Sequence, residues 1–186
     1  MNENEVKIAP RLALYHATGR GTGSAATFEV VPATAGDSGA IRLKLARQAT
    51  VGNRQGPTPS YSRFDWEHAL VVKLGFADLC AFLQVFRGER ESLADGRGLL
   101  HVSARAQTSI RLSHRVEPSP GYSLEVYRKT LASGEESRAA ILLTDSEAVG
   151  LCEAIAGSMA VICFGVPVER PSAPRAAKEA GDAAAA

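Results

Sequence analysis

The sequence is short of the residues that cross-link small domains, because only 3 of its 186 residues are cysteines. Cys80, Cys152 and Cys163 form no CxxC pair, which argues against a disulfide framework or a structural zinc site and indicates a reducing compartment. The start of the chain lacks the apolar core of a signal peptide. The longest apolar helical stretch, 148–164, is shorter than the roughly 20 residues that cross a bilayer, and Glu153 interrupts it. These absences predict a cytoplasmic protein that spans no membrane.

Neither sign of charge predominates, since 21 Lys and Arg stand against 20 Asp and Glu and leave a formal net charge of +1. That balance excludes a uniformly basic coat for nucleic acid, so any polyanion site must come from charge gathered on one face. Hydrophobic residues make up 45% of the chain, which is enough for one folded domain. We expect this domain over residues 9–165, after a flexible N-terminus at 1–8 and before a disordered tail at 166–186.

Apolar and polar residues alternate with period two in several segments, as they do in half-buried antiparallel strands. The clearest case is 41–45, although its sequence leaves open whether the strand is central or at an edge. Gly, Pro, Asp and Ser separate the segments and supply the turns between strands. The other predicted strands are 12–17, 26–31, 64–74, 99–106, 109–116, 123–129 and 138–143.

Two segments change to helical spacing, with apolar residues on one helix face at 76–86 and again at 148–163. Thr144 and Glu147 precede the second segment as a capping box, in which the two side chains bond the free backbone N–H groups of the first turn. A shift of 72 residues lays the strand end and helix of one half on those of the other. The sequence therefore predicts an α+β fold of two ββββα repeats, at about 9–90 and 97–165, with curved antiparallel sheets and helices packed on one side.

Charge is divided between the element types. Five basic residues and no acid lie between positions 40 and 64, and the predicted strands from 97 to 129 are also basic, whereas most acids lie on the helices and their flanks. If the helices cover one face of each sheet, the bare face presents Arg and Lys interleaved with tyrosines, which can follow a phosphate backbone and stack bases. Strands also carry Lys and Arg on a wet face to block edge pairing, so a merely solvated face is an equal alternative.

No constellation of catalytic residues stands out. The GDSG at 36–39 matches the tetrapeptide around the nucleophile of trypsin-like proteases, but too few residues precede Ser38 to supply that family's His and Asp, and a turn explains the composition. The four histidines show no HExxH spacing and no Cys partners at ligand distance. We expect a protein that is not an enzyme and that holds no metal and no cofactor.

The order of elements resembles the Whirly and PC4-like single-stranded-DNA-binding fold. The resemblance rests on the stretch 69–79 with its helix, on Gly-Tyr-Ser-Leu-Glu-Val-Tyr-Arg-Lys at 121–129, and on 140–143 with a helix that closes on Phe164-Gly165. It covers about 9–165 and implies basic, curved sheets that bind single strands and helices that build oligomers. The chain looks like the two-unit Whirly form, but it lacks the Lys-Gly-Lys-Ala-type strand motif of the plant proteins, so their contact residues do not carry over.

Our leading hypothesis is therefore a homo-oligomeric protein that binds single-stranded DNA or RNA, with DNA favoured, and with weak sequence selectivity. The alternative is an oligomeric protein-interaction module whose basic sheet meets an acidic protein. In the first hypothesis the arginines and lysines neutralise phosphates and the tyrosines stack bases. The predicted nucleic-acid-binding residues are Arg42, Lys44, Arg47, Arg54, Tyr61, Arg63, Arg105, Arg111, Arg115, Tyr122, Arg128 and Lys129.

Overall fold

The structure is a computed structural model that describes residues 11–53, 55 and 58–166. Its first antiparallel sheet, sheet 1, has the order β1-β2-β3, and both β4 and β5 pair with β3, which is therefore a central strand. The strands of sheet 1 are β1 (Arg11–His16), β2 (Ser24–Val31), β3 (Ala40–Thr50), β4 (Arg63–Phe64) and β5 (Leu70–Leu74).

The second antiparallel sheet, sheet 2, is a meander in which each strand pairs with the next one along the chain. A helix follows the last strand of each sheet, so the predicted pair of ββββα units is confirmed in its order of elements. The remaining elements are α1 (Phe76–Phe86), the short 3-10 helix η1 (Leu93–Gly96), β6 (Leu99–Val102), β7 (Ala106–Arg115), β8 (Gly121–Thr130), β9 (Glu136–Leu143) and α2 (Asp145–Phe164).

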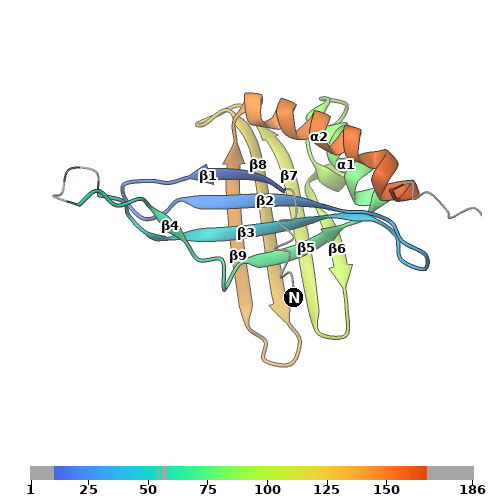
Figure 1. The fold of residues 1–186 in the computed structure, drawn as a ribbon, viewed down its shortest axis with the longest axis horizontal. Coiled ribbons are helices and arrows are strands. Elements are labelled where there is room, and N and C mark those ends of the chain that lie inside the picture. The colour runs from blue at the N-terminus through green and yellow to red at the C-terminus, as the bar shows by residue number, and fades with distance from the viewer. Residues whose placement is uncertain (1–10, 54, 56–57, 167–186) are drawn as a thin grey trace, which may run out of the picture.

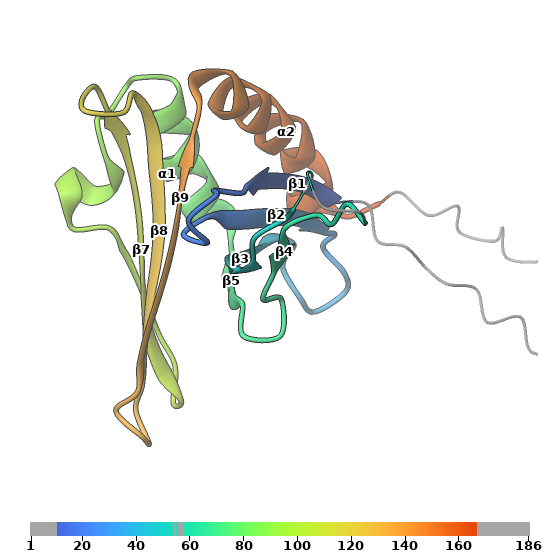
Figure 2. The same ribbon diagram turned by 90° about the vertical axis from the view of Figure 1, so that its left-hand side faces the viewer.

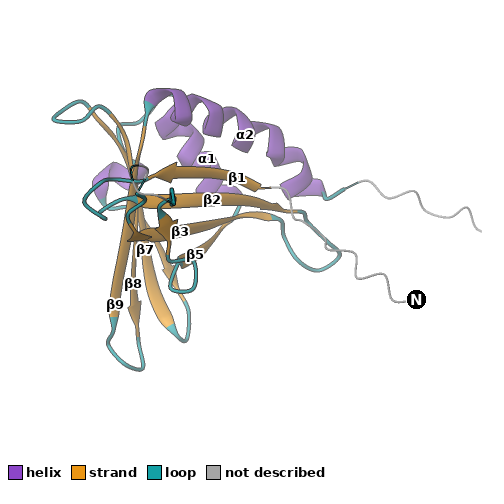
Figure 3. Cartoon of the chain, turned by 60° about the vertical axis from the view of Figure 1, so that its left-hand side comes forward, coloured by secondary structure: helices purple, strands orange, loops and turns teal. Residues whose placement is uncertain are grey.

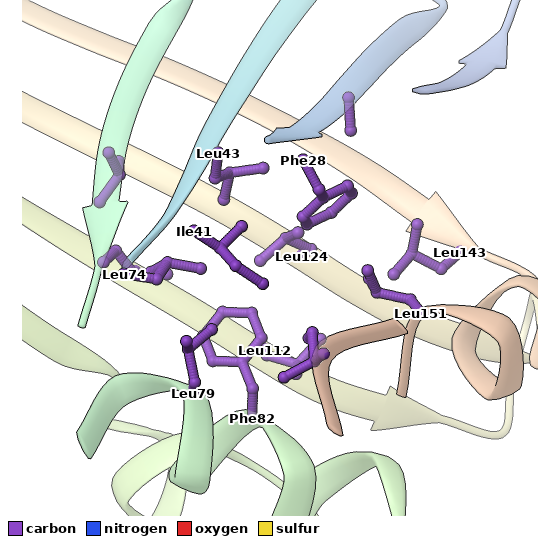
Figure 4. Packing of buried hydrophobic residues seen from close by; sticks show 14 of the residues in the cluster. Phe28, Ile41, Leu43, Leu74, Leu79, Phe82, Leu112, Leu124, Leu143 and Leu151 are labelled. Atoms are coloured by element: carbon purple, nitrogen blue, oxygen red, sulfur yellow. The ribbon is translucent and has the colours of Figure 1, made fainter. Parts of the chain in front are cut away.

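The two sheets cross rather than lie parallel, as Figure 1 shows. Figure 2 shows the helices at one end of the space between the sheets, and Figure 3 shows α1 and α2 together on the same side of the strands. Each sheet therefore has an inner face, which points toward the other sheet and the helices, and an outer face that these elements leave bare. Figure 4 shows the inner faces meeting in one core, where Leu43 of β3, Leu124 of β8, Phe82 of α1 and Leu151 of α2 are buried together.

The two helices begin where the sequence predicted. The Thr144 hydroxyl accepts a hydrogen bond from the Glu147 N–H at 3.2 Å, and the Glu147 carboxylate accepts one from the Thr144 N–H at 2.8 Å, so the capping box is confirmed. The N-caps Gly75 and Thr144 are 69 residues apart, and a buried leucine precedes each. The predicted shift of 72 is wrong, because a difference of three residues would place inner-face strand residues on the outer face.

Two predicted strands were too long. The segment 64–74 divides into β4 and β5 because the carboxylate of Asp65 accepts a hydrogen bond from the N–H of His68 at 3.1 Å and turns the chain. The segment 99–106 ends at Val102, since the Ser103 hydroxyl accepts a bond from the Ala106 N–H at 3.1 Å and closes a hairpin. In both places a local side-chain bond to the backbone overrides the period-two pattern.

Helix α2 is 20 residues long, and much of its surface is not buried by the rest of the chain. Its 20 residues include an 18-residue window with a mean hydropathy of 1.6, so by length and composition alone it could cross a membrane, a test that core helices of soluble proteins also pass. Its inner side, with Leu151 and Ile155, packs into the core, but 28% of that window is buried. Val149 and Phe164 remain exposed on its outer side, and Phe164 keeps 88% of its surface accessible.

Candidate nucleic-acid interface

The outer face of sheet 1 carries charge in a row that runs across four strands. The strand register places Arg11 opposite Glu29, Glu29 opposite Arg42, and Arg42 opposite Lys73. Neighbouring strands lie about 4.8 Å apart, so the row spans about 15 Å. The row has three cations and one anion, and it keeps a net positive charge when the pairing of Lys73 with Asp37 is included, so we call it the positive strip.

The cations of this strip differ in how far they are neutralised. The Arg42 guanidinium donates to both carboxylate oxygens of Glu29, each at 3.1 Å, and Lys73 donates to Asp37 at 3.1 Å. The next row of the outer face contains Lys44, which lies opposite Thr27 on β2. Lys44 makes no ion pair with any residue of the described ranges, so its ammonium is available for an external anion.

An aromatic cluster lies on the same outer face at the other end of β1, four residues along the strand from Arg11. The ring centroid of Tyr15 lies 5.6 Å from that of Phe64 and 6.3 Å from that of Trp66, and the rings of Tyr15 and Trp66 meet edge to face at 86°. Together with Tyr61 these rings line a cavity of about 840 Å³, which we call the aromatic pocket. Tyr61 is 79% exposed and Tyr15 53% exposed, so aromatic surface is open to solvent in a concave site.

The described part of the loop that carries the pocket, residues 51–53, 55 and 58–62, is held at its base by one buried amide. The Gln48 Oε1 accepts from the N–H groups of Thr18 at 2.8 Å and Gly23 at 3.0 Å, and its Nε2 donates to the carbonyls of Thr18 at 3.0 Å and Thr50 at 3.1 Å. Nε2 also lies 3.4 Å from the hydroxyl of Ser62. Gln48 thus joins the β1–β2 turn, the end of β3 and the far side of the loop at Ser62.

The outer face of sheet 2 is charged as well, and two of its cations, Lys129 and Arg138, form ion pairs within that face. Lys129 pairs with Glu136 at 3.3 Å, and the guanidinium of Arg138 bonds the Glu125 carboxylate, which also lies opposite Arg111. Tyr127 donates a hydrogen bond to Glu136, which raises the pKa of the tyrosine and lowers the pKa of the carboxyl group. Pairing therefore takes up two cations on this face, as it does on the outer face of sheet 1, and in the described part of the chain sheet 2 has no aromatic pocket beside its charges.

Two of the arginines predicted to bind phosphate instead tie the sheets together. Arg47 of β3 donates from Nε to the carbonyl of Arg138 on β9 at 3.0 Å. Arg128 of β8 donates from Nε to the Thr108 hydroxyl at 3.2 Å and bonds the Val71 carbonyl on β5 with its terminal nitrogen. In each half, an arginine of the third sheet strand bonds the last strand of the other half. The prediction that these two side chains share a bare sheet face is wrong.

Tyr122 also departs from its predicted position. The strand register puts it opposite His114 and Leu143 on the inner face of sheet 2, and its ring lies 5.3 Å from that of Phe86. Burial, followed by the nearby Asp145 charge, raises the pKa of its hydroxyl. The predicted strand, 123–129, did not include Tyr122. Strand β8 begins two residues earlier, and Tyr122 falls in its apolar phase.

The other predicted residues lie in several places. Tyr61 and Arg63 line the aromatic pocket. Arg105 lies in the exposed β6–β7 turn, and Arg115 lies at the end of β7 on the outer face of sheet 2. Arg54 lies outside the described residues.

Sequence reasoning missed the aromatic residues Tyr15, Phe64 and Trp66. A signal existed for Tyr15, because it occupies the polar phase of a strand in which Leu12, Leu14 and His16 share the inner face. An aromatic ring in that phase points to solvent and is a candidate contact. Phe64 and Trp66 gave no such signal, since their orientation follows from the turn after β4.

No protein-family model matches this chain, and no curated protein matches its sequence. Its fold is similar to that of WHY1 from Arabidopsis thaliana, with a TM-score of 0.64, 15% identity, and coverage of 86% of this chain and 88% of that chain. The plant transcriptional regulator PBF-2 gives a TM-score of 0.60 at 18% identity, covering 84% and 83%.

A solved complex of a guide-RNA-binding protein bound to a guide RNA is also similar, with a TM-score of 0.51, 13% identity, and coverage of 85% of this chain and 94% of that chain. At these identities the likeness concerns the fold. The chain therefore has a Whirly-like fold, as its sequence pattern predicted.

Proposed function

We propose that this protein binds single-stranded nucleic acid, DNA in the first instance, on the outer face of sheet 1. The observation that carries the proposal is that one outer face carries, in successive rows, the positive strip, unpaired Lys44 and the Tyr15 ring of the aromatic pocket. Cations neutralise phosphates, and exposed rings stack bases. The guide-RNA-bound structure, which has a similar fold, supports the same class of ligand. No chemistry is required of the protein, which acts as a binder rather than an enzyme.

The arrangement favours single strands over duplexes. The rings of Tyr15 and Trp66 lie in a concavity beside the loop 51–62, where a base can enter only if it is unpaired and unstacked. A duplex would present its phosphates to the positive strip but would leave the rings without a partner. The affinity for a duplex should therefore come from the contacts between cations and phosphates alone and should be weaker than the affinity for a single strand.

The protein contains one tryptophan, Trp66, so its intrinsic fluorescence reports on this site directly. Titration with a mixed-sequence single-stranded DNA should quench this emission, with a dissociation constant that weakens as salt rises. Each neutralised phosphate contributes a slope of about −0.7 to log K against log salt for single strands, so three contacts give about −2. An affinity no better than millimolar at low salt, or quenching equal with a duplex, would reject the proposal. Binding of an acidic protein without any effect of oligonucleotide would favour the protein-interaction alternative.

We also propose that α2 joins copies of the chain into a homo-oligomer. Gly150 and Gly157 lie inside this helix with no atom within 4 Å of the position a Cβ would take. A glycine in a helix costs about 1 kcal/mol relative to alanine, and no contact within the described residues requires a glycine at either position. Close approach of a second helix would use both positions. Light scattering should give a multiple of the 19.6 kDa chain mass, and Gly157→Leu should shift it toward the monomer. A monomer mass for the unsubstituted protein would reject this part.

A further inference from the structure

We infer that the aromatic pocket is a nucleotide site in its own right, which holds one unpaired base and prefers a purine. The inference deepens the proposed function and rests on it for the biological ligand. It goes further because a free nucleoside monophosphate should occupy the pocket without the rest of a polynucleotide. It also predicts a base preference at one position, whereas stacking on an open sheet would accept every base equally.

The rings of the pocket are placed to receive a base. Tyr15 meets Trp66 edge to face and meets Phe64 at an interplanar angle of 49°, so no two of these rings stack face to face. The faces of these rings are therefore not stacked on one another and can contact a base. The cavity of about 840 Å³ lies within the range of small-molecule sites, roughly 300–1,000 Å³. A purine covers more of such a wall than a pyrimidine and stacks more strongly on it.

Polar groups that also line the pocket can bond the edge of the base. The Ser60 hydroxyl accepts from the Asn53 N–H at 3.0 Å, and the Ser62 hydroxyl accepts from the Gly52 N–H at 3.0 Å. A hydroxyl that accepts from the backbone keeps its own proton for donation. Purine ring nitrogens are acceptors, so both serines offer them the complementary group. Arg63 lies exposed at the same pocket and can meet the 5′-phosphate.

The pocket is preformed at its base. A Cβ built at Gly52 would stand 2.7 Å from the Ser62 N and 2.8 Å from the Ser60 carbonyl oxygen, so the two sides of the loop approach as closely as backbone allows. The Gln48 amide holds the same end of the loop from below. A site that is already shaped loses little conformational freedom on binding, which favours a small ligand.

The test is a titration of Trp66 fluorescence with adenosine monophosphate, uridine monophosphate and ribose 5-phosphate. We expect saturable quenching by the adenine nucleotide, at least fivefold weaker affinity for the uracil nucleotide, and no quenching by the sugar phosphate. Tyr15→Ala should weaken the affinity for adenosine monophosphate at least tenfold. Ser60→Ala should weaken this affinity less and should leave the fold intact. Tyr122→Phe, which changes a tyrosine on the inner face, is the matched control and should leave the affinity unchanged. Circular dichroism of each variant checks that it is folded.

Three outcomes separate this inference from the proposed function. Salt-sensitive binding of oligonucleotide with no saturable response to adenosine monophosphate would overturn the pocket and leave the proposed function standing. Response to the mononucleotide without oligonucleotide binding would uphold the pocket and overturn the proposed function. Absence of both would overturn both. Equal affinity for the two nucleotides would overturn the purine preference. If neither Tyr15→Ala nor Phe64→Ala changes the affinity for adenosine monophosphate, the base binds outside the aromatic pocket and the inference is overturned.

Discussion

His16 Nε2 lies 2.7 Å from Glu147 Oε1 and so joins the end of β1 to the first turn of α2. Glu147 is also the carboxylate of the capping box of that helix. The other half repeats the contact, since His101 Nε2 of β6 lies 3.1 Å from Oδ2 of Asp78, the corresponding acid of α1. In both cases a histidine of the first strand in one half bonds the helix of the other half.

These contacts match the two arginines that cross between the sheets. Arg47 and Arg128 each bond a backbone carbonyl of the opposite half, just as His16 and His101 each bond a helix of the opposite half. The two halves are thus joined by two kinds of contact, arginine to strand carbonyl and histidine to helix carboxylate, and each kind occurs once in each direction. This pseudo-symmetry concerns the scaffold, whereas the aromatic pocket belongs to the first half alone.

The first prediction concerns acid sensitivity. Burial opposes ionisation of Glu147, but hydrogen bonds from His16 and Thr144 outweigh it and lower the pKa of the carboxyl group below its ordinary value of 4.5. A lowered folded-state pKa contributes stability above the unfolded value, and that stability is lost as the pH falls through the folded pKa. Glu147→Gln should reduce the free energy of unfolding by about 1–2 kcal/mol at pH 7 and by less near pH 3.

Urea unfolding of both proteins across this pH range measures the difference. Glu153→Gln, on the exposed side of the same helix, is the control and should change the stability little at either pH. A loss in Glu147→Gln that is equal at pH 7 and pH 3 would show that the capping geometry matters and the charge does not.

The second prediction separates the two sheets as binding faces. Lys44→Gln should weaken the binding of single-stranded DNA. It should also reduce the slope of log K against log salt by about 0.7 in magnitude, because one phosphate contact is lost. Lys129→Gln removes the same charge from sheet 2, where Glu136 already neutralises it. Fluorescence titrations at several salt concentrations should therefore show a smaller effect for Lys129→Gln. The reverse order would move the interface to sheet 2.

The third prediction distinguishes a core tyrosine from a contact tyrosine. Tyr122→Ala should lower the free energy of unfolding by about 2–4 kcal/mol, because its ring packs on Phe86 and leaves a cavity when removed. The folded fraction should still bind DNA with unchanged affinity. Tyr15→Ala, at a half-exposed position, should show the opposite behaviour, with a small change in stability and a large loss of affinity. Thermal unfolding and DNA titration on the same samples compare the two.

The fourth prediction concerns the amide beneath the pocket. Gln48→Ala leaves the N–H groups of Thr18 and Gly23 without their acceptor, which should cost about 2–4 kcal/mol of stability. Gln48→Glu restores the acceptor but brings a carboxylate against the carbonyl of Thr50. That variant should be unstable at pH 7 and recover below pH 5, where a protonated acid can donate again. A pH-independent loss would mean that the donor side of Gln48 contributes little.

Much of the fold could be predicted because its signals are local. The capping box at Thr144 and the helix periodicity depend on residues a few positions apart, and the alternation at 41–45 depends on neighbours two apart. The strand ends at Phe64 and Val102 were misjudged because one side-chain bond to the backbone can end a strand without changing its pattern. The candidate site was predicted only in part for a different reason, which is that charge alone does not reveal pairing.

The sequence by itself determined the class of fold, the two helices and the basic character of the strands, since these follow from short-range periodicity and composition. Only the tertiary structure decided which cations are free, because the partners of Arg47 and Arg128 come from distant strands. It also decided where the rings meet, since Tyr15 and Trp66 become neighbours only when β1 and the chain after β4 converge at the edge of sheet 1. Contacts between distant segments depend on how the sheets cross, and no local pattern records that crossing.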